Sequence, residues 1–139
     1  MKIKKFLLFF LISSFLVITL FSAYFLIFIP TDDSITEKNL NTAINEASVS
    51  NKAVILLFYA DWCPVCQRFF ETTLSNNSVH ENLNRNYIVV NVETSLNPGI
   101  RDRYNVKKRP TLIFLNQKGK ESKRIEGYID TQGLLSQLN

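Results

Sequence analysis

The chain has 139 residues, which allows one folded domain, and its two ends differ sharply in composition. Three of its 16 basic residues, Lys2, Lys4 and Lys5, precede a long apolar run. Residues 31–139 contain 13 basic and 12 acidic side chains, so the net charge of +4 does not indicate nucleic-acid binding.

The apolar run covers residues 6–29 and contains no charged residue, Gly or Pro. It exceeds the ~20 helical residues that cross a bilayer, and the lysines before it favour a cytoplasmic N-terminus. The alternative is a cleaved signal peptide, whose apolar part is usually ~7–15 residues and ends at a small-x-small site. Ser22 and Ala23 offer only a weak site of that kind. We therefore expect residues 1–30 to be an uncleaved anchor and residues 31–139 to be an exported domain.

The first part of this domain predicts a helix, a buried strand and a second helix. Residues 35–48 carry apolar side chains at helical spacing behind a capping box that begins at Ser34. Residues 53–59, AVILLFY, form a continuous apolar run, as in strands that are buried on both faces. A helix is expected to open near Cys63 and to lead to a second strand at residues 87–92. Such a β-α-β unit closes right-handed on a parallel sheet.

The second part predicts a hairpin between two helices. Asn97-Pro98-Gly99 breaks the chain ahead of a short polar helix. Residues 111–116 and 121–128 read as two strands joined by a Gly-containing turn. Asp130 or Thr131 can cap a last helix. The expected order is α-β-α-β-α-β-β-α.

The two cysteines, Cys63 and Cys66, have C-x-x-C spacing, for which three interpretations compete. A structural zinc site needs four N or S ligands, and only His80 is available besides the pair. A Cu(I) carrier could use two thiolates, but no Met or His flanks them. A redox dithiol at a strand-to-helix junction is the interpretation that the sequence favours. It requires no metal and no cofactor.

The junction assigns different roles to the two thiols. A helix N-terminus presents unpaired N–H groups and a partial positive charge, which favour a thiolate at Cys63. Pro64 then occupies the first helical position, where its missing N–H costs nothing. Cys66 lies one turn further and should be shielded. We expect Cys63 to be the nucleophile and Cys66 to resolve the mixed disulfide.

Residues 59–66, YADWCPVC, resemble the W-C-x-x-C motif of the thioredoxin superfamily. Together with TTLSNNSV at residues 72–79, they resemble the C-terminal thioredoxin-like domain of DsbD-type transmembrane thiol reductases. Arg109-Pro110-Thr111 resembles the cis-proline loop of the family, and residues 126–130 its closing strand. The similarity covers residues 38–139. It implies an α/β thioredoxin-like fold, a central mixed sheet flanked by helices.

The resemblance also implies how the site is built. Pro110 would be cis and lie beside the cysteines, so that the backbone of Arg109 faces an extended substrate strand and Thr111 opens the next strand. Trp62 would cover the rim of the site. The alternatives are a Pro110 that merely begins a strand and a Trp62 that is partly buried in the core.

The sequence departs from the family at two acidic positions. Thioredoxins and the DsbD-type domain usually carry a buried acid six residues before the first cysteine, and this position is Leu57 here. The DsbD-type domain also has a Glu four residues after the second cysteine, and this position is Phe70 here. Asp61 and Glu71 are the remaining nearby carboxylates, so proton transfer to Cys66 has no assured acceptor. The electron-conducting multi-helix membrane part of DsbD-type proteins does not occur in this sequence, which implies that a separate membrane protein exchanges electrons with the domain.

A basic stripe precedes the proline loop. It either is a solvated face or stabilises the Cys63 thiolate and steers an acidic partner. His80 is assigned no role. The stripe consists of Arg101, Arg103, Lys107, Lys108 and Arg109.

These observations predict a thiol–disulfide oxidoreductase on the periplasmic side of a bacterial inner membrane, or its equivalent. A reductase or electron relay acting on exported protein thiols is the leading hypothesis. Pro64-Val65 does not fix the redox potential, so an oxidase or isomerase of the same fold is a second hypothesis. A non-catalytic binding or assembly module is a third.

Overall fold

The computed structural model describes residues 14–15, 17–19 and 37–138, which belong to two separate units, residues 1–33 and 34–139. In the first unit the described residues are helical, and Phe15, Val17 and Ile18 are exposed. Within the described ranges, no helix is both long and apolar enough to cross a membrane. Most of the predicted anchor, and Ser34 of the predicted capping box, lie outside those ranges.

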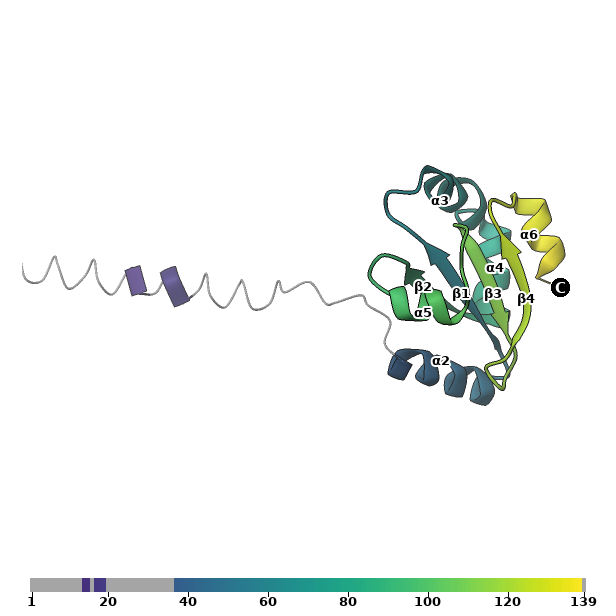
Figure 1. Cartoon of the computed structure of the whole chain (residues 1–139), viewed down its shortest axis with the longest axis horizontal. Coiled ribbons are helices and arrows are strands. Elements are labelled where there is room, and N and C mark those ends of the chain that lie inside the picture. The colour runs from purple at the N-terminus through teal and green to yellow at the C-terminus, as the bar shows by residue number, and fades with distance from the viewer. Residues whose placement is uncertain (1–13, 16, 20–36, 139) are drawn as a thin grey trace, which may run out of the picture. The chain divides into compact units, whose positions relative to one another are not determined.

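The second unit is a four-stranded sheet with helices on both faces (Figure 1). Its elements are α2 (Glu37–Ser50), β1 (Ala53–Tyr59), α3 (Pro64–Phe69), the π-helix η1 (Phe70–Leu74), α4 (Asn77–Asn86), β2 (Tyr87–Glu93), α5 (Pro98–Arg103), β3 (Thr111–Leu115), β4 (Glu121–Glu126) and α6 (Thr131–Gln137).

The strand order is β2-β1-β3-β4, with β1 parallel to β2 and β3 antiparallel to both β1 and β4. The predicted mixed sheet is therefore confirmed. β1 is an interior strand, and its five central residues are all buried. A strand that is covered on both faces cannot alternate polar and apolar residues, which explains the continuous run AVILLFY.

Alternate side chains of β1 belong to two apolar clusters on opposite faces. Leu56 and Phe58 pack with residues of α2 and α5, whereas Ile55 and Leu57 pack with residues of α3, α4 and α6. Figure 1 shows the same division of the helices between the two faces. The second face carries the helix that begins beside the cysteines, so its packing fixes where the dithiol lies.

The single helix predicted between β1 and β2 was wrong, because three helical segments occupy this interval. In η1 the buried hydroxyl of Thr73 donates to the carbonyl oxygen of Ile129 at 2.8 Å, which ties this turn to the segment before α6. Asn76 then ends the run and caps α4, its side-chain oxygen accepting from the N–H groups of Ser78 and Val79.

Two glycines shape the hairpin of β3 and β4. β4 ends at Glu126, two residues earlier than expected, because Gly127 has a φ of +86°, which is outside the extended region. In the hairpin turn Gly119 has a φ of +70°, and a Cβ there would lie 2.9 Å from Cδ1 of Ile44 in α2. Glycine is therefore required at position 119 both for the turn and for the approach of α2.

Candidate active site

The two cysteines lie where β1 ends and α3 begins (Figure 1). Cys63 is the N-cap of α3 and donates its backbone N–H to the carbonyl oxygen of Ala60 at 3.1 Å. Pro64 occupies the first turn of the helix, which places Cys66 one turn further along the same face. Both thiols are therefore close together in the first turn of α3, directly after the end of β1.

The geometry of the dithiol distinguishes the two sulfurs. Their Sγ atoms are 2.6 Å apart, with the Cys66 thiol donating to Cys63. The Cys63 sulfur also accepts the backbone N–H of Cys66 at 3.3 Å. Cys63 retains 8% exposure and Cys66 none. Only Cys63 therefore has surface through which another sulfur can approach, and the pair is close enough to close a disulfide with little backbone movement.

Burial, together with the hydrogen bond to Cys63, raises the pKa of Cys66 to about 11. The nearby Arg109 guanidinium acts in the opposite direction, with a smaller effect on this pKa. Because a thiol with so high a pKa stays protonated near neutral pH, Cys66 must lose a proton before it can attack a disulfide.

The loop before β3 lies against the dithiol. The Arg109–Pro110 peptide bond is cis and Pro110 is buried. The carbonyl oxygen of Arg109 is 4.0 Å from Sγ of Cys63, so these residues, 46 positions apart in sequence, are neighbours in space. Thr111 is buried at the start of β3, and its hydroxyl donates to the carbonyl oxygen of Lys108 at 2.8 Å. This hydrogen bond within the loop helps to fix its conformation.

Trp62 lies on the rim, with 66% of its surface exposed. Its indole N–H donates to Oγ of Ser95 at 3.4 Å, and the guanidinium carbon of Arg109 lies 5.0 Å from the centre of its ring. The structure thus brings Trp62, Cys63 and Arg109 together and places Trp62 at the surface rather than in the core.

Two residues of the basic stripe form surface ion pairs, and one lies at the dithiol. Arg101 pairs with Asp102 at 2.7 Å, and Lys108 lies 3.8 Å from Glu126. Such exposed pairs are ordinary features of a solvated face. Arg109 is the residue of the five that lies beside both Trp62, through its guanidinium, and Cys63, through its carbonyl oxygen.

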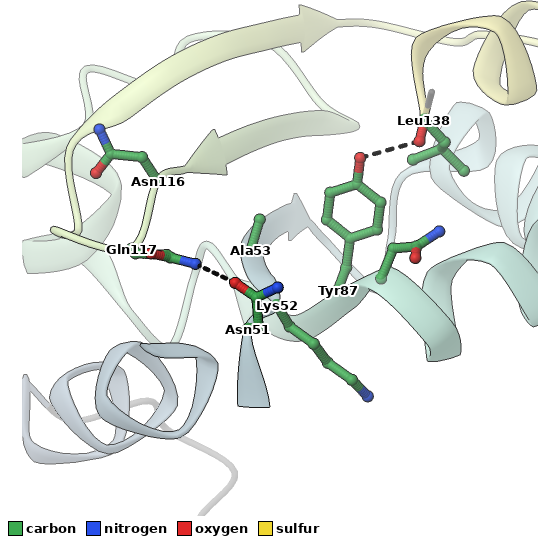
Figure 2. Close-up of a pocket in the computed structure, with 8 residues that line it drawn as sticks. Asn51, Lys52, Ala53, Tyr87, Asn116, Gln117 and Leu138 are labelled. Carbon is green, nitrogen blue, oxygen red and sulfur yellow. Dashed lines mark hydrogen bonds between the residues drawn. The ribbon is translucent and has the colours of Figure 1, made fainter. Parts of the chain in front are cut away.

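A pocket of about 540 Å³ opens at the opposite end of the sheet, beside the first residue of β1 (Figure 2). Figure 2 shows the Tyr87 hydroxyl donating to the carbonyl oxygen of Leu138 at 3.2 Å, and Gln117 donating to Asn51 at 2.9 Å. Burial raises the pKa of Tyr87. The lining contains amides and Lys52 but neither cysteine, so the dithiol rather than this pocket is the candidate for chemistry.

Comparison with known proteins gives a consistent answer. A family model described as a thioredoxin-like domain matches residues 40–139. The chain belongs to the thioredoxin-like family.

Sequence relatives are thiol:disulfide interchange proteins named DsbD. The protein from Actinobacillus pleuropneumoniae is 32% identical over 94 residues, which are 63% of this chain and 16% of the relative. DsbD 1 from Pseudomonas aeruginosa is 33% identical over 108 residues, which are 74% of this chain and 18% of the relative. The chain thus spans less than a fifth of the length of these two relatives.

Solved structures give the same fold. A thioredoxin from Thermus thermophilus superposes with a TM-score of 0.63 at 26% identity, covering 70% of this chain and 79% of that one. The oxidised C-terminal domain of Neisseria meningitidis DsbD superposes with a TM-score of 0.61 at 21% identity, covering 75% and 94%. The predicted thioredoxin-like fold is therefore confirmed, and family and dithiol geometry together support thiol–disulfide oxidoreductase activity.

Apolar packing occupies the two positions where the resemblance to thioredoxins and to the DsbD-type domain led us to look for an acid. Leu57 is 1% exposed inside the cluster that covers α3. Phe70 lies edge-on to Tyr59 with ring centres 5.4 Å apart and packs against the cysteines. Asp61 and Glu71 are both exposed. Among the described residues, no carboxylate is recorded as a hydrogen-bond partner of Cys66, whose thiol bonds to Cys63.

Two polar residues that shape the rim, Glu93 and Ser95, were not predicted from the sequence. Glu93 is buried at the end of β2, and its Oε2 accepts the N–H groups of Ser95 and Leu96, both at 2.7 Å. Its Oε1 is buried and has no hydrogen-bond partner among the described residues. Glu93 therefore shapes the loop from which Ser95 bonds Trp62. A charged residue directly after the predicted strand at residues 87–92 was the signal that could have indicated this role.

We expect the second step of disulfide exchange, attack by Cys66, to be limited by deprotonation of Cys66. Because the pKa of Cys66 is raised to about 11, its thiolate fraction should increase roughly tenfold per pH unit between pH 7 and 9. The decay of a mixed disulfide between Cys63 and a test thiol, followed by stopped-flow and mass spectrometry, should accelerate with pH accordingly.

A matched pair of substitutions at Leu57 tests the missing acceptor. Leu57→Asp should accelerate this decay near pH 7 and flatten its pH profile, because a buried carboxylate can take the proton. Leu57→Asn has a similar size and cannot take a proton, so it should leave the profile unchanged. Both changes should lower the free energy of unfolding by several kcal/mol, since each buries a polar group in an apolar cluster. A wild-type decay independent of pH would contradict the expectation.

Proposed function

We propose that this protein is a membrane-anchored thiol–disulfide oxidoreductase that reduces exported proteins or relays electrons among extracytoplasmic thiol proteins. One observation carries the proposal, namely a partly accessible Cys63 sulfur with the buried Cys66 thiol 2.6 Å behind it. The similarity to proteins named thiol:disulfide interchange proteins supports the same reaction class.

In the first step the Cys63 thiolate attacks one sulfur of a substrate disulfide. A bond forms between Cys63 and that sulfur, the substrate S–S bond breaks, and the second substrate sulfur leaves as a thiolate that takes up a proton. The N–H of Cys66, 3.3 Å from the Cys63 sulfur, stabilises the attacking thiolate.

In the second step Cys66 loses its proton and attacks the Cys63 sulfur. The mixed disulfide breaks, the first substrate sulfur leaves as a thiol after protonation, and the Cys63–Cys66 disulfide forms. Two electrons have then passed from the protein to the substrate. Resetting the site takes two electrons from another dithiol, and we assign that task to a partner protein in the membrane.

The cis-proline loop and Trp62 form the substrate side of the proposed site. The Arg109 carbonyl, 4.0 Å from the nucleophile, offers an acceptor to an extended substrate backbone. Pro110 and Thr111 hold this loop, since the Pro110 carbonyl accepts the N–H of Gly127 at 2.7 Å and the Thr111 hydroxyl bonds within it. The exposed Trp62 ring covers the rim and reduces access of water to the exchanging sulfurs.

The reaction class is tested by cysteine variants of the full-length protein. Wild type should reduce insulin with dithiothreitol as the electron source, and Cys63→Ser should be inactive because the nucleophile is gone. Cys66→Ser should accumulate mixed disulfides, since Cys63 still attacks but nothing resolves the adduct. Non-reducing gels would reveal these adducts. Equal activity of wild type and Cys63→Ser, or adducts that form through Cys66 instead, would contradict the assignment.

The direction of electron flow is tested by the equilibrium potential of the pair. We expect a value nearer to the about −270 mV of thioredoxin than to the about −120 mV of a strong oxidant. The reason is that Pro64-Val65 contains no His that would stabilise the reduced form through the Cys63 thiolate. Titration in dithiothreitol buffers with thiol labelling measures this. A potential close to −120 mV would instead indicate an oxidase.

The anchor is tested in the cell membrane. The charge-free run at residues 6–29 behind three lysines should keep the full-length protein in the pellet after carbonate extraction. A chain from which residues 1–30 are deleted is the control and should be released. A released product that has lost about 25–30 residues would show a cleaved signal peptide and contradict the anchor.

A further inference from the structure

The side chain of Arg109 is a cation held beside the nucleophile. Its guanidinium carbon lies 5.0 Å from the centre of the Trp62 ring, and its own carbonyl is 4.0 Å from Sγ of Cys63. In the part of the chain that the structure describes, no carboxylate is recorded in an ion pair with Arg109. The charge is therefore fixed in place and available for another partner.

Two acids, Glu126 and Asp102, are paired with other cations. Glu126 lies 3.8 Å from Lys108 and 3.6 Å from Arg124, and Asp102 pairs with Arg101. Asp61, in the same loop as Trp62, is exposed but forms no recorded ion pair with Arg109.

Exposed apolar side chains lie on the segment that carries Cys63 and on the loop that contacts Trp62. Trp62, Val65 and Leu96 are 66%, 46% and 58% exposed, although large apolar side chains are usually covered. Leu96 follows Ser95, which accepts the indole N–H of Trp62. We call Trp62, Val65, Leu96 and Arg109 the cysteine rim. It combines three apolar contacts with one positive charge.

We propose that the cysteine rim selects protein disulfides with a carboxylate residue next to the target cysteine, and that Arg109 binds this carboxylate. The inference rests on the proposed function and adds the substrate class. A guanidinium stacked on an aromatic face still presents N–H donors at its edge, and these match a carboxylate in geometry and charge. The carbonyl oxygen of Arg109 lies 4.0 Å from Sγ of Cys63 and its guanidinium carbon 5.0 Å from the centre of the ring of Trp62, the residue next to Cys63, so a residue adjacent to the attacked cysteine would lie near this side chain.

The test compares two disulfide peptides that differ only in Glu or Gln beside the cysteine. Reduced full-length protein reacts with each peptide in a single turnover, and each rate is divided by the rate with dithiothreitol to remove intrinsic reactivity. Wild type should prefer the Glu peptide by about fivefold, which corresponds to a partly exposed ion pair. The preference should shrink at high salt, since screening weakens such a pair.

A matched pair of variants, Arg109→Gln and Lys107→Gln, assigns the preference to Arg109, and Arg109→Lys is a third. Arg109→Gln should abolish it, whereas Lys107→Gln, which removes the same charge two residues away, should retain it. Arg109→Lys keeps a charge without the planar donor edge and should retain part of it. If Arg109→Gln does not fold by circular dichroism, Arg109→Lys and the salt dependence decide the question.

Equal normalised rates for the two peptides with wild type would overturn the proposal. A preference that survives in Arg109→Gln, or that is insensitive to salt, would do the same. Failure of the proposed function looks different, because then neither peptide is reduced, the Gln peptide included.

Discussion

The burial of β1 on both faces determines where the dithiol lies. Its apolar side chains alternate between two clusters, which covers the strand with helices on each side. β1 ends at Tyr59, and the carbonyl of the next residue, Ala60, accepts the N–H of Cys63. α3 begins just after Cys63, which leaves Cys63 8% exposed and Cys66 fully buried. The proposed order of attack follows from this difference in depth.

The same burial creates the chemical difficulty of the site. Leu57 and Phe70 contribute apolar packing at the two positions where the resemblance implied carboxyl groups, and this favours the fold because a buried acid without partners is costly. The packing also removes the group that would accept the Cys66 proton, while burial raises the pKa of that thiol to about 11. Apolar packing around Cys66 therefore favours a stable domain and opposes fast resolution.

The run AVILLFY and the C-x-x-C turn were predicted because each specifies its own local structure, and β1 and the start of α3 lie there. The cis bond at Pro110 was expected only from the family resemblance, and it is present. The interruption of the helix after α3 depends on a Thr73 hydrogen bond to Ile129, 56 residues away, which no local pattern reveals. The support of Trp62 by Ser95 and Glu93 likewise depends on contacts between separate loops.

The basic stripe shows why charge in a sequence needs a structure to interpret it. In the sequence, Arg101 and Lys108 carry the same charge as Arg109. In the structure, each of them has an acidic neighbour that offsets its charge. Arg109 differs because its guanidinium lies over the Trp62 ring and its carbonyl oxygen lies 4.0 Å from Sγ of Cys63. In the proposed function Arg109 has two roles. Its backbone carbonyl lies beside the nucleophile, and its side chain binds a substrate carboxylate next to the target cysteine. Chemistry and substrate choice are coupled through this single position.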